Sequence, residues 1–112
     1  MPNTSTNLAN EALDKLGMVG IGQSPEAEDT EKVLLAYPRF KATLEAQDIY
    51  TIADDNDIDD AAFNWLAEYL AYVVSGKFQK PTDEGRRQAA EYHLTRISAS
   101  RPTRERLVVD YF

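Results

Sequence analysis

The spacing of apolar residues predicts helices along most of the chain. Apolar side chains recur every three or four positions, and no alternating stretch flanked by hairpin turns precedes the last six residues. A first helix is expected to begin between Thr4 and Asn7, where side chains can cap free amides, and to run to Leu16. Gly17 can then supply a left-handed stop. The apolar face of this helix contains Leu8, Ala9, Ala12, Leu13 and Leu16.

A second helix is expected after Ser24, which can cap it. Pro25 suits the first helical position, and the acidic residues that follow complement the positive end of the helix dipole. Pro38 lies inside the pattern and removes one backbone hydrogen bond, so a kink or break is predicted near Tyr37. We expect a bent helix that ends near Ala46. Its apolar face contains Val33, Leu34, Ala36, Tyr37, Phe40 and Leu44.

The third predicted helix, from about Asp59 to Phe78, is the most apolar of the set. Its apolar residues cover more than one face, which is typical of a central helix that contacts several neighbours. These residues are Ala62, Phe63, Trp65, Leu66, Tyr69, Leu70, Val73 and Val74. Gly76 and Pro81 are expected to close this helix.

A fourth helix is expected to be capped by Thr82 or Asp83 and to end near Ser98. Its narrow apolar face contains Ala89, Ala90, His93, Leu94 and Ile97, with Arg86, Arg87 and Arg96 outside it. The pattern therefore predicts an all-α fold: a small bundle of about four helices over residues 1–98.

Residues 99–112 are predicted to form an extended C-terminal arm. Pro102 keeps its predecessor extended. In a strand, Leu107, Val109 and Tyr111 face one side, with Val108 and Phe112 on the other. Because this apolar end has no hairpin partner of its own, it is typical of a strand that binds another protein's sheet or groove.

Composition supports one folded domain. The chain has 112 residues, of which 43% are hydrophobic and 28% are charged, close to the globular average. The absence of cysteine excludes a disulfide framework and a thiolate metal site. No basic start followed by an apolar run occurs near Met1, and no apolar stretch approaches the length of a membrane span. We therefore expect a soluble protein that is not exported by a signal peptide.

The net charge of -7 is distributed unevenly. Residues 1–85 carry 16 acids and 6 bases, net -10, whereas residues 86–112 carry 6 arginines and 3 acids, net +3. An acidic body disfavours nucleic-acid binding, which depends on Lys and Arg neutralising phosphates. The basic end suits an acidic partner, or it is only a solvated helix face with a soluble tail.

Two motifs resemble ligand sites but lack essential parts. The glycines of GMVGIGQS follow a helix and not a strand, and no Lys-Ser/Thr pair comes after them, so a connection is favoured over a nucleotide site. The acidic turn has no glycine at loop position six, and counting from Asp55 places Leu66 at position twelve, where a calcium loop needs glutamate. We expect an acidic turn that caps the third helix, formed by Asp54, Asp55, Asp57, Asp59 and Asp60.

His93 is the only histidine and has no Ser or Asp at a spacing typical of a catalytic triad. A position at the boundary of the helix is therefore favoured over a catalytic role. No catalytic, metal-binding or cofactor-binding residue is predicted, and the chain is not expected to be an enzyme.

Three stretches taken together resemble a known protein family. They are LANEALDKLGMVGIGQSPEAEDTEKV, IYTIADDNDIDDAAFNWLAEYLAYVVSGKF and RPTRERLVVDYF. Their order resembles the small head-to-tail adaptor (connector) proteins of tailed bacteriophages, and among these the tail accessory, or packaged-DNA stabilisation, family of short-tailed phages. The similarity covers nearly the whole chain. It departs from the family pattern at Ile58, which is followed by Asp59 where the family commonly has proline.

The resemblance implies a ring, typically of twelve copies, beneath the portal protein at the capsid vertex. Genomic DNA would pass through its channel without specific binding, and a downstream tail or nozzle protein would bind the other face. Residues 101–112 would be the portal-docking arm. Its apolar anchors would be Leu107, Val109, Tyr111 and Phe112, with Arg101, Arg104 and Arg106 orienting them against acidic surface. The expected location is the virion, after assembly in the host cytoplasm.

Two other functions remain open. The chain could be a stand-alone helical interaction module whose C-terminal peptide binds a cellular protein. It could also be a cell-wall or phosphoryl hydrolase, but no paired glutamates form a convincing site.

Overall fold

Side-chain caps set the start of three helices. The computed structural model describes residues 3–19, 23 and 25–100. Helix α1 (Ser5–Lys15) begins after Thr4, whose hydroxyl accepts a hydrogen bond from the Asn7 amide. Helix α3 (Asp60–Val74) is capped by the Asp59 carboxylate. Helix α4 (Glu84–Ser100) begins after Asp83, whose carboxylate accepts from the Arg86 amide. All three caps confirm the sequence analysis.

Helix α2 (Ala27–Ala46) begins differently from the prediction. Pro25 and Glu26 precede the helix, and no side-chain hydrogen bond caps it. The predicted cap, Ser24, lies outside the described residues. The helix ends at Ala46, as expected, and continues through Pro38 without a break.

The continuity of α2 has a physical reason. The Pro38 ring is exposed, so it does not collide with the core. Buried side chains on both sides of Pro38, among them Val33 and Leu44, hold the two halves of the helix against the same core. Packing therefore offsets the lost backbone hydrogen bond.

Helix α3 is shorter than predicted because a 3₁₀ turn, η1 (Ser75–Phe78), follows it. Gly76 lies within this turn and does not close the helix. The chain reverses instead at Gln79, which adopts a left-handed conformation with φ 56°. At the other end of the bundle, α4 continues to Ser100, two residues beyond the predicted boundary at residue 98.

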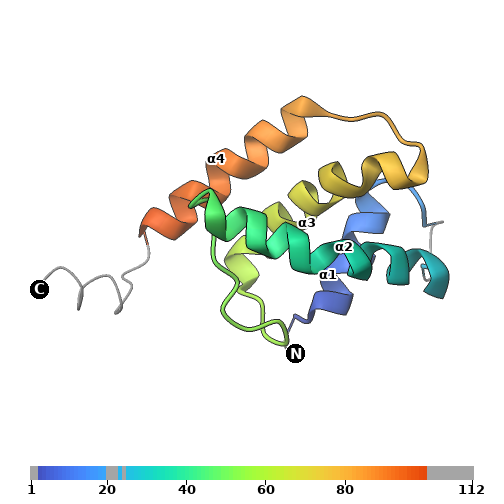
Figure 1. Ribbon diagram of the computed structural model, residues 1–112, viewed down its shortest axis with the longest axis horizontal. Coiled ribbons are helices and arrows are strands. Elements are labelled where there is room, and N and C mark those ends of the chain that lie inside the picture. The colour runs from blue at the N-terminus through green and yellow to red at the C-terminus, as the bar shows by residue number, and fades with distance from the viewer. Residues whose placement is uncertain (1–2, 20–22, 24, 101–112) are drawn as a thin grey trace, which may run out of the picture.

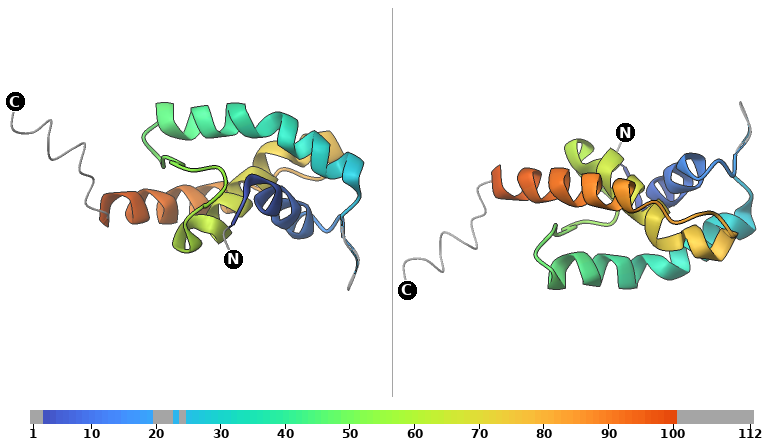
Figure 2. Two further views of the ribbon diagram at one scale, coloured as in Figure 1. Left: turned by 90° about the horizontal axis from the view of Figure 1, so that it is seen from below. Right: turned by 90° about the horizontal axis from the view of Figure 1, so that it is seen from above.

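The buried core is centred on α3, which packs against α1, α2 and α4 (Figure 1). Figure 2 shows that α2 forms one side of the bundle, apart from α4. The large side chains that are fully buried are Leu8, Leu13, Val33, Leu44, Leu66, Leu70, Val74 and Leu94. The all-α class and the four-helix bundle are thereby confirmed. Within the described part of the chain, no helix is long and apolar enough to cross a membrane.

The connection between α2 and α3 also contributes to the core, which the helical pattern did not predict. Ile49, Tyr50, Ile52 and Ile58 are all buried. An isolated antiparallel bridge between Asn3 and Ile58, with an Ile58 amide to Asn3 carbonyl distance of 2.7 Å, holds this connection beside the start of α1.

Candidate functional site

The seven residues predicted to bind a portal lie outside the described residues. They are Arg101, Arg104, Arg106, Leu107, Val109, Tyr111 and Phe112. Half of the glycine-bearing loop, at residues 20–22 and 24, lies outside them as well. The remaining candidates are the acidic turn, His93 and the surfaces between helices.

Two carboxylates of the acidic turn, Asp55 and Asp59, make contacts that stabilise the fold. One Asp55 carboxylate oxygen accepts hydrogen bonds from the Tyr37 hydroxyl at 2.8 Å and from the Lys41 ammonium at 3.0 Å. The Lys41 and Tyr37 hydrogen bonds lower the pKa of Asp55, whereas burial and the Asp55 contact raise the pKa of Tyr37. Asp59 caps α3. In the described residues no group of three or more acidic or histidine side chains is placed to hold a metal ion.

His93 packs between α3 and α4. Its ring stacks on Trp65 with a centroid separation of 3.9 Å and an interplanar angle of 12°. Tyr92 contacts the imidazole edge-on at 5.2 Å. His93 is half-buried and packs against aromatic rings.

A groove of about 790 Å³ lies between α2 and α3, and we call it the α2–α3 groove. Its walls include Leu35, Pro38, Arg39, Tyr72, Val73 and Lys77. Leu35 is 82% exposed and Val73 is 42% exposed, although both are large apolar residues. A groove of this size with exposed apolar walls is suited to binding.

Aromatic rings form the inner part of the groove. Phe40 and Tyr69 lie 5.9 Å apart between ring centroids, and Tyr69 contacts Tyr72 edge-on at 6.0 Å. The Tyr72 hydroxyl donates to the Glu84 carboxylate at 2.9 Å, so the first turn of α4 borders the groove. This groove is therefore lined by rings in fixed positions.

The Glu84 carboxylate is shared between two partners. Arg87 donates to it at 2.8 Å and also pairs with Glu91. The Arg87 and Tyr72 hydrogen bonds lower the pKa of Glu84, and the contact with Glu84 raises the pKa of Tyr72. These contacts orient Tyr72 beside α4.

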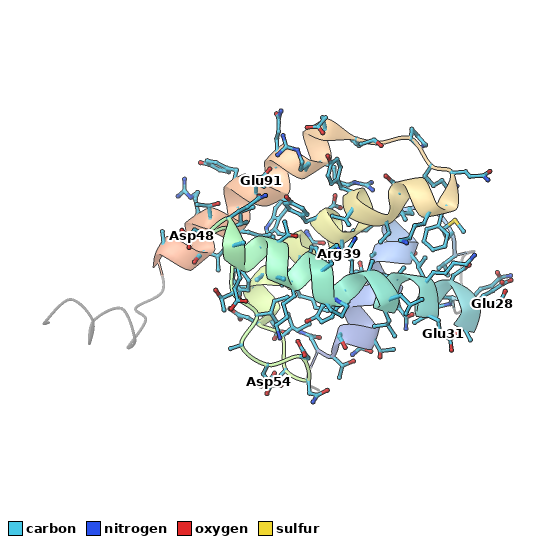
Figure 3. All side chains as sticks on the ribbon, viewed as in Figure 1. Glu28, Glu31, Arg39, Asp48, Asp54 and Glu91 are labelled. Atoms are coloured by element: carbon cyan, nitrogen blue, oxygen red, sulfur yellow. The ribbon has the colours of Figure 1, made fainter. Side chains whose placement is uncertain are left out.

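Arg39 and Lys77 give the groove a positive rim. Both are exposed, and in the part of the chain that the structure describes neither is in an ion pair. Figure 3 shows Arg39 on the middle part of α2. The groove can therefore accept a ligand that combines apolar groups with negative charge.

Sequence reasoning did not identify this groove. The sequence pattern places Val73 among the apolar residues that cover more than one face of the third helix, and it gives Leu35 no special role. The available signal was the position of Leu35, two residues after the buried Val33 and therefore on the other side of α2. An apolar residue outside the buried stripe is a weak indicator by itself.

Comparison with known proteins does not assign the chain to a family. No family model matches it, and no curated protein or solved structure is significantly similar to it.

Proposed function

We propose that the protein is a structural adaptor of a tailed-phage virion that forms a ring beneath the portal and connects the capsid vertex to the tail. The observation that carries this proposal is the apolar segment at residues 107–112, preceded by three arginines. Leu107, Val109 and Tyr111 lie on one side of an extended backbone, and the sequence offers no hairpin partner for them. We assign this apolar end to a partner's sheet or groove.

The distribution of charge is consistent with an adaptor. An acidic helical body has little attraction for DNA that moves through a ring, because like charges repel. Several arms on one ring act together through their effective concentration, so each arm needs only modest affinity for the portal. In this proposal the body serves as a spacer and the arm as the attachment.

The arm residues have two roles. Leu107, Val109, Tyr111 and Phe112 are the apolar anchors, and Arg101, Arg104 and Arg106 orient them against acidic portal surface. A downstream tail protein would bind the opposite face of the ring. The proposed adaptor function requires no catalytic residue.

Co-sedimentation with portal rings from the same source genome tests the proposal. We expect the full chain to sediment with the rings at a ring-like stoichiometry. The double variant Tyr111→Ala/Phe112→Ala should lose this binding, because it removes two aromatic anchors. The matched control is Tyr92→Ala, which truncates a tyrosine that is 56% exposed on α4.

One result would contradict the assignment of the arm, and another would contradict the adaptor function. Equal binding of the double variant and the full chain would exclude the arm as the attachment. If neither bound the portal but the full chain bound one host protein saturably, the function would be that of a helical interaction module with a cellular partner.

A further inference from the structure

We propose that the α2–α3 groove binds residues 107–111 of the same chain when no partner holds them. This inference goes beyond the adaptor function and does not depend on it. It assigns a specific occupant to the groove, an extended apolar segment of the chain's own C-terminal region.

The chemistry of the groove matches this segment. Leu35, Val73 and the aromatic rings offer apolar contacts, while Arg39 and Lys77 offer positive charge at the rim. In an extended backbone, Leu107, Val109 and Tyr111 lie on one side and can enter the groove together. Asp110 then faces the other way, toward the rim, where it can pair with a cation.

The segment is long enough to reach the groove. The hydrogen bond between Tyr72 and Glu84 places the start of α4 at the groove, and α4 carries the chain away to Ser100. This distance along the helix is about 24 Å at 1.5 Å per residue. Residues 101–112 span up to about 40 Å when extended. The segment can therefore return along α4 as far as the groove.

The charges along this return path are in the favourable order. The C-terminal ends of α2 and α4 lie at the same end of the molecule (Figures 1 and 2), and Asp48 lies there (Figure 3). The exposed carboxylates Glu45 and Asp48 are therefore first on the path. Residues 101–106 hold three arginines and one acid, Glu105, and are net positive, whereas Asp110 comes later, toward Arg39 and Lys77.

Attachment to the same chain favours this contact. A tethered segment has a high effective concentration at a site within its reach, so weak individual contacts suffice. If the adaptor function is correct, the groove and the portal compete for the same residues. Isolated chains would then keep their apolar ends covered until a portal is present.

Paramagnetic relaxation in the full chain tests the inference directly. Because the sequence has no cysteine, Val108→Cys supplies a single site for a nitroxide label, and Val108 faces away from the proposed groove contact. We expect the amide signals of Leu35, Val73 and Lys77 to broaden more strongly than that of Asp54. Asp54 lies on the side of α2 away from α4 (Figure 3) and serves as the reference.

A pair of charge variants tests the groove itself. Leu35→Asp places a negative charge where the segment would bind, and the 82% exposure of Leu35 means that the fold tolerates the change. We expect the broadening at Val73 and Lys77 to fall at least threefold. Ala42→Asp adds the same charge at an exposed position of α2 that does not line the groove, and it should leave the broadening unchanged.

Two outcomes would overturn the inference. Broadening that is no stronger at the groove than at Asp54, or that is insensitive to Leu35→Asp, would show that the segment does not bind there. Broadening of isotope-labelled chains by spin-labelled, isotope-free chains would show that the groove binds a second copy instead. Portal binding is measured separately, so failure of this inference is distinguishable from failure of the adaptor function.

Discussion

At the scale of single residues, Asp55 illustrates how tertiary contacts change the meaning of a sequence motif. Its cluster of neighbouring carboxylates resembles a calcium loop but lacks the required glycine and glutamate, and a helix-capping turn was expected. In the folded chain its side chain instead binds Tyr37 and Lys41 of α2, and its backbone carbonyl accepts from the Ser5 amide at 2.8 Å. A single residue thus joins the acidic turn to α1 and α2.

This role predicts a pH-dependent contribution of Asp55 to stability. The pKa of Asp55 is lowered in the folded chain from its ordinary value of 3.8, so the ionised side chain stabilises the fold at pH values above 3.8. The contribution is lost as the pH falls through the lowered folded pKa. We expect Asp55→Asn to reduce the free energy of unfolding by about 1 kcal/mol at pH 7, with a smaller difference in acid.

Urea unfolding of both proteins between pH 7 and pH 2 measures this effect. Asp57→Asn is the control, because Asp57 is exposed in the same turn and should change the free energy of unfolding by less than about 0.5 kcal/mol. A difference for Asp55→Asn that stayed constant across the pH range would contradict the proposed contribution of the ionised carboxylate.

At the scale of the helices, side-chain caps were easier to predict from sequence than helix ends. Thr4, Asp59 and Asp83 cap as expected because each bond joins residues that are neighbours in the chain. The prediction that Gly76 closes α3 was wrong, because the left-handed residue in this region is Gln79 and not Gly76. Leu70 and Val74 are buried up to the last turn, and this packing carries the chain past the glycine.

The two glycines should therefore respond differently to alanine. Gly17 follows α1 with φ 76°, and no atom lies within 4 Å of the place that an added methyl group would take, so the cost of Gly17→Ala comes from the backbone conformation alone. We expect a loss of about 1 kcal/mol in the free energy of unfolding. Gly76→Ala has equal space without a left-handed backbone and should be neutral or stabilising by about 0.5 kcal/mol.

Thermal and urea unfolding of the two variants provide the comparison. Equal destabilisation by both substitutions would mean that the left-handed conformation at Gly17 is not what requires glycine there.

At the scale of the whole molecule, Glu68 of α3 connects α1 and α4, which are far apart in the sequence. Its carboxylate pairs with Lys15 of α1 at 3.2 Å and with Arg86 of α4 at 3.0 Å. Arg86 also donates to the Lys15 carbonyl at 3.3 Å. All three side chains are about one quarter exposed or less, so solvent screens their interaction only in part.

We expect Glu68→Gln to lower the free energy of unfolding by about 1 kcal/mol in 0.1 M salt, because two partly buried cations lose their shared carboxylate. The loss should shrink in 1 M salt, where the Debye length falls to about 3 Å. Chemical unfolding at both salt concentrations measures it. Glu31→Gln, at an exposed position of α2, is the control and should have little effect. A loss that did not change with salt would indicate a packing role for Glu68.

The sequence by itself determined the helices and most of the residues that they bury. Both depend on local physics: the 3.6-residue repeat places apolar side chains on one face, and a cap lies within three residues of the amide that it binds. The apolar C-terminal segment was also evident, but its residues lie outside the described part of the chain, so its portal-binding role stays a prediction.

Only the tertiary structure decided which apolar residues remain exposed and which polar groups meet. Val73 follows the same periodic pattern as the buried Leu70, yet it lines an open groove between α2 and α3, and α2 and α4 do not pack on each other. Glu68 reaches two cations that are 53 and 18 positions away, and no local pattern encodes such contacts. Periodicity defines the face of a helix, whereas the packing of distant helices determines how much of that face is covered.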